Sequence, residues 1–343
     1  MVYFEIHYFT KKKEFQGLAS IKGFNFFKGL ITQTTLVLGS TGQDGSLISK
    51  SLLQEGHKVL ALTRGNSQKC ENFRKLGIHE DIINIQCDLT SFSALTRIIH
   101  KYSPENIFNL ACQSSVGKSF SVPRETTESI YDVSLNLLEA SRALNYQGKI
   151  FFAGSSEMFG EIKSKANIYH PQNPKSPYAI AKQASYNLVK LYREIYDLKC
   201  MTGILFNHES NLRPETFVIP KIIKTAYQIR QGQASQLEVG NIDIIRDWGW
   251  APEYINAMKL ITKSDIVKDH IICTGNANSL KTLIEKVFKK FGLEWKEFTS
   301  INKKYYRKTD IQRSCGDPEP IFNELGWRAK IDIDTIIEKM ISY

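Results

Sequence analysis

The chain of 343 residues contains no apolar run of the ~18 residues that a membrane-spanning helix needs, and we therefore expect no membrane span. It also lacks an internal repeat, a low-complexity tract and a recognisable nucleic-acid-binding module. The formal net charge is +10, but the lysines and arginines are spread along the chain rather than gathered in one stripe. This spread argues against nucleic acid as a partner, whereas a phosphorylated ligand or an ordinary basic protein fits the charge.

The six cysteines show no CxxC or metal-type spacing, so the sequence predicts no metal site. Most of them lie in apolar runs, where a cysteine is usually a small buried hydrophobic residue. Unpaired thiols are typical of a reducing compartment, and we expect a cytoplasmic protein.

Residues 1–34 differ from the rest of the chain because they mix aromatic with basic side chains. They lack the single apolar core and the small-residue cleavage site of a signal peptide. We interpret this segment as a poorly ordered N-terminal extension, with a weak surface-binding segment as the alternative.

From residue 35 the sequence alternates between short apolar runs and segments of helical periodicity. Such alternation predicts right-handed βαβ units and hence an α/β fold with a Rossmann-type doubly wound parallel sheet. Residues 35–206 should form mainly this domain. Residues 207–343, where the rhythm becomes irregular, should form mainly a smaller C-terminal substrate lobe, with some segments returning to the first domain. The predicted strands are residues 35–38, 58–62, 82–87, 106–110, 149–153 and 201–206. The predicted helices are residues 46–54, 91–102, 126–144, 178–196, 218–231 and 280–291.

A glycine-rich loop follows the first predicted strand and opens the first predicted helix, with glycines spaced as GxxGxxG. Glycines at this place permit a tight turn, close approach of the backbone to a diphosphate, and close packing of helix on strand. The start of the helix then presents N–H groups and a positive dipole to phosphate groups. We predict a dinucleotide cofactor bound by Gly39, Thr41, Gly42, Gln43, Asp44 and Gly45.

The end of the second predicted strand indicates which cofactor binds. A site for NAD usually has an acidic residue there for the ribose 2′-hydroxyl, whereas this chain has Arg64. A guanidinium pairs well with a 2′-phosphate, so we expect NADP; a solvated loop arginine is the alternative. Ligands of open α/β sheets bind at the carboxyl ends of strands, so the cofactor site should also include Asp88, Leu89, Leu110, Ala111, Gln113 and Ser114.

Four residues form a candidate catalytic group. Tyr178 and Lys182 form a YxxxK motif, and residues four apart on a helix share one face. The cation favours loss of the phenol proton, so Tyr178 can take a proton from a sugar hydroxyl as a hydride leaves for the cofactor. Ser155 can hydrogen-bond that hydroxyl. Glu157 can remove a carbon-bound proton and help hydroxide leave, although a carboxylate that caps the following turn is the alternative.

These residues resemble those of an extended short-chain dehydrogenase/reductase, specifically of the GDP-mannose 4,6-dehydratase family. The resemblance extends from about residue 35 to the C-terminus. Besides the glycine loop, Ser155, Glu157 and the YxxxK motif, it rests on two further segments. They are Asn207-His208-Glu209-Ser210 and Arg246-Asp247-Trp248-Gly249.

The resemblance implies a lyase that uses a recycled NADP to oxidise C4 of GDP-mannose, with Tyr178 as the base. Glu157 then removes the C5 proton, water leaves from C6, and the hydride returns to C6 to give GDP-4-keto-6-deoxymannose. Family members pair through two long helices, so we expect a homodimer. His208 and Arg213 match cofactor-contacting positions of the family, as do Tyr178 and Lys182. The expected contacts to the nucleotide sugar are Ser114, Ser155, Glu157, Asn207, Lys221 and Arg246.

The chain also departs from the family pattern. Gly65 follows Arg64 where a second arginine is usual, in a loop that in many relatives helps dimers form tetramers, which leaves tetramer assembly open. Leu212 precedes Arg213 where the family has paired arginines. A dehydratase or epimerase for another nucleotide sugar, such as a GDP-heptose, therefore remains an alternative, as does a non-catalytic NADP-binding protein.

Overall fold

The structure of the chain, a computed structural model, describes residues 33–65, 70–307 and 309–342. The predicted N-terminal extension lies outside the described residues except at its last two positions. Within the described part of the chain, no helix has both the length and the apolar character to cross a membrane.

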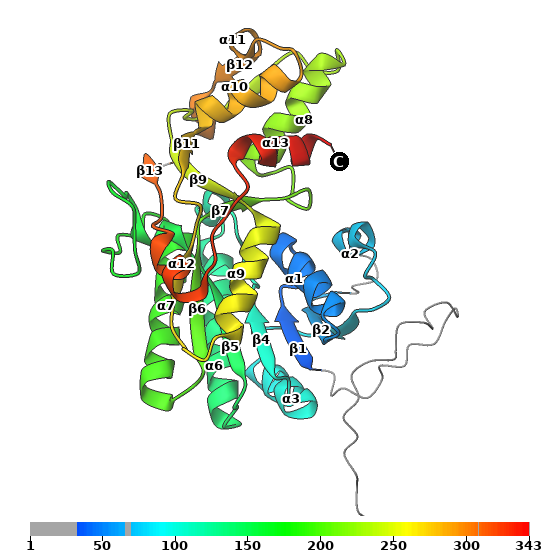
Figure 1. Ribbon diagram of the computed structural model, residues 1–343, viewed down its shortest axis with the longest axis vertical. Helices are drawn as coiled ribbons and strands as arrows, with labels where there is room; N and C mark the ends of the chain where they lie inside the picture. Colours follow the sequence, from blue (N-terminus) through cyan, green and yellow to red (C-terminus); the bar gives the residue numbers. More distant parts are fainter. Residues whose placement is uncertain (1–32, 66–69, 308, 343) are drawn as a thin grey trace, which may run out of the picture. The chain divides into compact units, whose positions relative to one another are not determined.

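Seven strands form a central sheet: β1 (Thr34–Leu38), β2 (Lys58–Thr63), β3 (Ile83–Gln86), β4 (Asn106–Asn109), β5 (Lys149–Ser155), β6 (Cys200–Leu205) and β10 (His270–Ile272). Their order is β3-β2-β1-β4-β5-β6-β10, and every neighbouring pair is parallel (Figure 1). The first six correspond to the six predicted strands, with small shifts at their ends. This is the doubly wound Rossmann arrangement, so the predicted fold class is confirmed.

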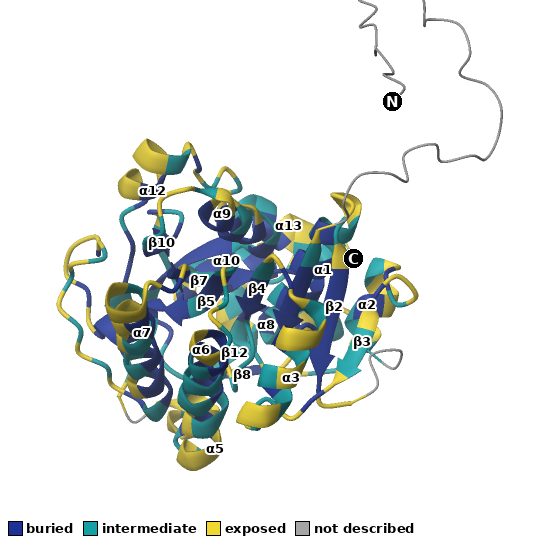
Figure 2. Ribbon diagram, turned by 90° about the horizontal axis from the view of Figure 1, so that it is seen from below, coloured by how far each residue is buried: buried dark blue, intermediate teal, exposed yellow. Residues whose placement is uncertain are grey.

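Helices cover both faces of this sheet. Successive side chains of a strand point to opposite faces, so neighbouring residues of one strand join different cores. Val37 belongs to the core formed with α1 (Gln43–Gln54), α2 (Glu71–Leu76) and α9 (Ala251–Lys263). Leu36 and Leu38 belong to the core formed with α3 (Phe92–Tyr102), α6 (Val133–Ala143) and α7 (Pro177–Tyr196). Figure 2 shows buried strands between helices whose outer faces are exposed. Burial on both sides explains why the central strands read as apolar runs, whereas the edge strand β3 is half polar and largely unburied.

The C-terminal part of the chain forms a second, smaller core. It is built from α8 (Val218–Arg230), α10 (Leu280–Lys290) and α13 (Ile333–Ile341), which are drawn together in Figure 1. A small mixed sheet has β9 (Ile245–Trp250) at its centre, paired with β7 (Asn207–Glu209), β11 (Ala277–Ser279) and β13 (Arg313–Ser314). A two-stranded sheet joins β8 (Leu237–Val239) to β12 (Thr299–Ile301). The remaining short helices are α4 (Val116–Ser119), α11 (Trp295–Phe298) and α12 (Glu319–Leu325).

The helix predicted over residues 126–144 is not regular. A π-turn over Glu128–Asp132 separates α5 (Pro123–Thr127) from α6. The turn contains Ser129, whose Oγ accepts a hydrogen bond from the Gln113 backbone N–H at 3.1 Å. Such a single π-turn within a helix is frequent beside functional sites, and here it ties the helix to the loop after β4.

Candidate functional site

A cavity of about 960 Å³ is lined by the loops that follow β1 to β6 and by residues of the smaller core. Every site residue predicted from the sequence lines this cavity except Arg246. The fold thus gathers residues that lie far apart in the chain. They are Gly39, Thr41, Gly42, Gln43, Asp44, Gly45, Arg64, Asp88, Leu89, Leu110, Ala111, Gln113, Ser114, Ser155, Glu157, Tyr178, Lys182, Asn207, His208, Arg213 and Lys221.

The glycine loop between β1 and α1 lies close to other backbone segments. Gly39 has a φ of +74°, and a Cβ there would lie 2.6 Å from the Ala111 backbone. A Cβ on Gly45 would lie 2.2 Å from the Gly39 carbonyl oxygen, so glycine alone lets α1 begin this close to the turn. No side chain caps the start of α1 at Gly42, and the first turn adjoins the cavity. A helix start of this kind fits the diphosphate of a dinucleotide.

The ends of β2 and β3 supply the next part of the cavity wall. Arg64 follows β2 and is exposed, and its carbonyl oxygen accepts a hydrogen bond from Gln86 Nε2 at 3.2 Å. Asp88 follows β3, and its Oδ1 accepts hydrogen bonds from the N–H and the hydroxyl of Thr90 at 3.0 and 2.7 Å. The wall beside β2 therefore carries a cation rather than the acidic group that is typical of an NAD site.

Tyr178 and Lys182 are buried on one face of α7. Ser176 fixes the start of this helix, because its Oγ accepts a hydrogen bond from the Ala179 N–H at 3.1 Å. The Lys182 ammonium donates to the Ala153 carbonyl oxygen at 2.7 Å and lies 5.8 Å from the centre of the Tyr178 ring. The helix thus presents the phenol to the cavity with its cation held beside it.

The electrostatics of Tyr178 differ in part from the sequence-based expectation. Burial raises the pKa of its phenol, and although Lys182 and Ser155 both lower it, the net shift is upward. The expected effect of Lys182 is present, but it offsets a desolvation penalty rather than producing a low pKa by itself. The sequence could not show this, because burial of the phenol depends on the surrounding fold.

Ser155 ends β5 and caps the short 3₁₀ turn that contains Glu157. The Ser155 Oγ accepts a hydrogen bond from the Glu157 N–H at 3.3 Å, so the serine and not the glutamate caps this turn. Within the described residues, no hydrogen bond or ion pair engages the Glu157 carboxylate, which belongs to the cavity lining. The carboxylate is therefore available to a ligand.

Arg246 and Lys221 have different surroundings. Arg246 is buried on β9, 3% exposed, and its Nη1 donates to the Ile245 carbonyl oxygen at 2.9 Å. Its Nη2 is buried without a hydrogen-bond partner among the described residues. Lys221 on α8 donates to the Glu238 carbonyl oxygen at 2.7 Å, and its ammonium lies 4.4 Å from the centre of the Tyr305 ring. An unpaired buried guanidinium nitrogen is costly unless an anion approaches it.

The cavity contains residues that the sequence analysis did not predict. Phe217 lies under the Arg213 guanidinium, 3.7 Å from the carbon atom of that group to the ring centre. Tyr305, Arg307 and Asp310 enter the cavity wall from a loop near the C-terminus. No motif or spacing marks these residues, because only the chain path of the smaller lobe brings them to the site.

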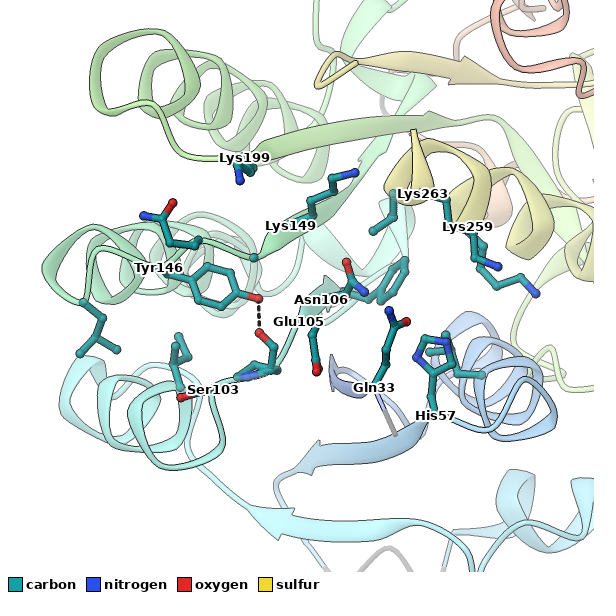
Figure 3. Close-up of a pocket in the computed structure, with 18 of the residues that line it drawn as sticks. Gln33, His57, Ser103, Glu105, Asn106, Tyr146, Lys149, Lys199, Lys259 and Lys263 are labelled. Atoms are coloured by element: carbon teal, nitrogen blue, oxygen red, sulfur yellow. Dashed lines mark hydrogen bonds between the residues drawn. The ribbon is translucent and has the colours of Figure 1, made fainter. Parts of the chain in front are cut away.

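A second cavity, of about 720 Å³, lies at the opposite, amino ends of the strands (Figure 3). It contains several lysines, and at least two of their ammonium groups have protein partners. Lys149 donates to the Ser264 carbonyl oxygen at 2.7 Å, and Lys263 donates to Glu55 at 2.9 Å. The hydrogen bond drawn in Figure 3 joins the Tyr146 hydroxyl to the backbone. None of the predicted site residues lines this cavity, so the candidate site is the one at the carboxyl ends.

Comparison with known proteins identifies the family. The profile of the family described as GDP-mannose 4,6 dehydratase matches residues 36–340. The chain belongs to this family. The predicted family is thereby confirmed, and the match includes every segment that lines the large cavity. GDP-mannose 4,6 dehydratase 1 of Arabidopsis thaliana is 36% identical over 319 residues, which cover 89% of this chain and 88% of the relative.

Solved structures share the fold of this GDP-mannose 4,6-dehydratase family member. UDP-glucose 4-epimerase of Thermotoga maritima, solved with UDP-glucose, superposes with a TM-score of 0.80 and is 22% identical, over 91% of this chain and 98% of the other. RMD of Pseudomonas aeruginosa, solved with NADPH, has a TM-score of 0.76 and 21% identity, over 91% of this chain and 98% of the other. At these identities the likeness shows a common fold.

Proposed function

We propose that the protein is a lyase that converts GDP-D-mannose to GDP-4-keto-6-deoxy-D-mannose and water. The observation that best supports this function is the convergence of Ser155, Glu157, Tyr178 and Lys182 on the cavity that contains the glycine loop. A reductase or epimerase needs only the hydroxyl and the Tyr/Lys pair. The carboxylate of Glu157, which no protein group engages among the described residues, supplies what an elimination of water also requires.

We propose NADP as the cofactor. The first turn of α1 would hold its diphosphate, and Arg64 at the end of β2 would pair with its 2′-phosphate. The NADPH in the RMD structure, which shares this fold, supports a cofactor of this class. When bound, NADP would supply the reversible hydride chemistry that the reaction needs.

The residues of the chain then act in sequence on the sugar. Ser155 holds the C4 oxygen while Tyr178 takes the C4 hydroxyl proton, and Lys182 stabilises the phenolate. The resulting C4 carbonyl acidifies the C5 hydrogen, which Glu157 removes as a proton. The protonated Glu157 then gives this proton to the C6 hydroxyl, which leaves as water. The hydride stored on the cofactor would return to C6, and the protonated Tyr178 would give its proton to C5, which completes the product and restores the phenolate.

We further propose that residues 35–206 bind mainly NADP and that residues 207–343 bind mainly the nucleotide sugar. Arg246 supports this division, because its buried Nη2 has no partner among the described residues and suits a diphosphate oxygen. Arg246 is not itself part of the cavity lining, but the lining residues Glu157, Arg307 and Asp310 are among the charged groups that influence its pKa. Asn207 and Lys221 line the cavity on the same lobe.

We also propose that the protein forms a homodimer through α7. This helix exposes Ile180, Leu191 and Ile195, which are 56%, 48% and 63% exposed. Their positions place them on one side of the helix. A row of exposed aliphatic side chains on a long helix is typical of a surface that packs against a second copy.

The test is incubation of the full chain with GDP-mannose and NADP, followed by mass spectrometry for loss of one water. We expect water loss with the wild-type chain and none with Glu157→Gln, which removes the charge and keeps the shape. Glu338→Gln, at an exposed glutamate of α13 that forms an ion pair with Lys290, is the matched control and should retain activity. If the wild-type chain binds NADP but releases no water from GDP-mannose, this substrate is wrong, and other nucleotide sugars would be tried.

A further inference from the structure

Three segments that are far apart in the chain meet in one buried cluster beside the glycine loop. His208 on β7 lies opposite Gly249 of β9, and its imidazole stacks on the Tyr254 ring of α9 with ring centres 4.7 Å apart. A Cβ on Gly249 would lie 2.2 Å from the Tyr254 ring, so glycine is needed for this stack. On its other side His208 reaches Asp44 in the first turn of α1, with Nε2 2.9 Å from Oδ2. The imidazole is therefore fixed between two elements of the Rossmann domain.

Both ring nitrogens of His208 face groups that only accept hydrogen bonds. Nδ1 lies 2.7 Å from the Phe206 carbonyl oxygen, and Nε2 lies 2.9 Å from the Asp44 carboxylate. A neutral imidazole has one N–H and would turn a lone pair toward one of these acceptors. Only the imidazolium, with two N–H groups, satisfies both.

The charges around the pair agree with this protonation state. Burial lowers the pKa of His208, but the Asp44 carboxylate raises it more, so the net shift is upward from 6.5. Burial also opposes ionisation of Asp44, but His208, Gln43 and Arg213 lower the pKa of that carboxyl to about 2. The two shifts are those of an ion pair in a buried place.

Other groups around His208 complete the balance of charge. Glu209 of β7 is buried, which raises its pKa, and the Arg213 Nε lies 3.5 Å from its Oε2. Tyr254 contributes a neutral phenol, because burial raises its pKa well above 10. The acidic groups Asp44 and Glu209 are thus matched by His208 and Arg213.

Gln43 adds a second tie between the first turn of α1 and β7. Its Nε2 donates to Asp44 Oδ1 at 3.0 Å and to the His208 carbonyl oxygen at 3.3 Å, and its Oε1 accepts from the Ser210 hydroxyl at 2.9 Å. The turn that would receive the cofactor diphosphate is therefore held by β7. It also contains an acidic side chain, which would repel a diphosphate if its charge were not neutralised.

We propose that His208 is a positioning residue for the cofactor: as an imidazolium it neutralises Asp44 and anchors the first turn of α1 in the form that binds the diphosphate. This inference rests on the proposed NADP site, and it gives His208 an indirect role, through Asp44. When the imidazolium loses its proton, one of its two acceptors faces a lone pair and the Asp44 charge is no longer compensated. Cofactor affinity should then fall as the pH rises through the titration of His208.

The test is a double-mutant cycle of His208 and Asp44, with NADP binding to the full chain measured by titration calorimetry. The measurements run from about pH 7 to about pH 9.5. In this range the 2′-phosphate of NADP, a monoester with a pKa of ~6, is already ionised and does not itself add a pH dependence. We expect the dissociation constant of the wild-type chain to rise about tenfold across this range and that of Asp44→Asn to stay flat. At the lower pH, His208→Gln should weaken NADP binding about tenfold in the chain that keeps Asp44. In the chain that already carries Asp44→Asn, the same substitution should weaken binding by less than about twofold, because the charge that His208 neutralises is gone. A tenfold effect corresponds to a coupling free energy of ~1.4 kcal/mol between the two residues.

A matched control comes from another buried aspartate. Asp269 accepts hydrogen bonds from Arg193 at 2.8 and 2.6 Å and from the Thr202 N–H at 2.7 Å, and it does not line the cavity. Asp269→Asn should lower thermal stability and leave NADP affinity and its pH dependence unchanged, which separates positioning from general destabilisation. If His208→Gln does not fold, the pH dependence of NADP affinity in the wild-type chain and in Asp44→Asn tests the inference without it.

Three results would overturn the inference. The first is a wild-type dissociation constant that does not change with pH. The second is an equal effect of His208→Gln in both backgrounds, and the third is a pH dependence that persists in Asp44→Asn. A wild-type chain that binds NADP and dehydrates GDP-mannose without this coupling would leave the proposed function intact. A wild-type chain that binds no NADP would overturn both.

Discussion

Replacement of Lys182 by methionine should move the acid limb of the pH–rate profile upward by about two pH units. The Lys182 ammonium lies 5.8 Å from the centre of the Tyr178 ring, and both side chains are buried. At an effective dielectric constant of ~20, two unit charges at this separation interact by about 3 kcal/mol. Because ~1.36 kcal/mol corresponds to one pH unit of the profile, loss of this interaction should move the acid limb by about two pH units.

The sign of the change follows from the proposed role of Tyr178 as a base. Burial already raises the pKa of Tyr178, and loss of the cation raises it further. A smaller fraction of the phenol is then ionised at any pH below its pKa, and the rate falls about tenfold for each unit of upward shift. At neutral pH the methionine variant should therefore be about 100-fold slower than the wild-type chain.

The assay is a single-turnover experiment in which GDP-mannose is mixed with protein saturated with NADP, and the absorbance of reduced nicotinamide is followed as a function of pH. Saturation with NADP separates this effect from any loss of cofactor affinity. Lys182→Arg keeps the positive charge and should keep the acid limb within about half a pH unit of the wild type. An acid limb that stays in place in Lys182→Met would refute the electrostatic role, and the hydrogen bond to Ala153 would then be the function of the lysine.

Three further predictions concern the cofactor loop, the cofactor choice and the smaller sheet. Gly45→Ala should abolish NADP binding, because the new Cβ would lie 2.2 Å from the Gly39 carbonyl oxygen, whereas Gly65→Ala meets nothing within 4 Å and should bind normally in calorimetry. Arg64→Asp should weaken NADP relative to NAD by at least about tenfold, measured as the ratio of dissociation constants. Asp247→Asn should lower the free energy of unfolding by about 3 kcal/mol in urea, because the buried carboxylate accepts three hydrogen bonds from the loop after β10.

Each of these predictions has a result that contradicts it. Normal NADP affinity in Gly45→Ala would show that the loop relaxes around a side chain. An unchanged ratio of NADP to NAD in Arg64→Asp would show that Arg64 is a solvated loop residue. For Asp247 the control is Asp334→Asn, which breaks a half-exposed ion pair with Lys286 and should change the free energy of unfolding by less than about 1 kcal/mol. Equal losses of stability in the two variants would show that the buried hydrogen bonds of Asp247 do not account for its effect.

The fold was predictable because its signals are local. Most strands from β1 to β6 are short apolar runs, and the helices that follow the strands show their periodicity within a dozen residues, so the alternation specifies a parallel sheet. Strand β10 and helix α9 were not predicted. Strand β10 has three residues, and α9 lies in the part of the chain where long loops obscure the rhythm. The π-turn at Glu128–Asp132 has no sequence signal that distinguishes it from a helix.

The sequence by itself determined the local motifs of the candidate site. Gly39, Gly42 and Gly45 predict a diphosphate loop, and Tyr178 with Lys182 predicts a base beside a cation, because in both motifs the functional groups are close in the chain and a single local element positions them.

Only the tertiary structure decided how these groups are tuned. The pKa of Tyr178 is raised by burial, Arg246 is buried and not part of the cavity lining, and Asp44 is joined to His208 across 164 positions of the chain. Burial and contacts between distant segments depend on how the two cores pack, and no periodicity or spacing in one segment carries information about the side chains of another.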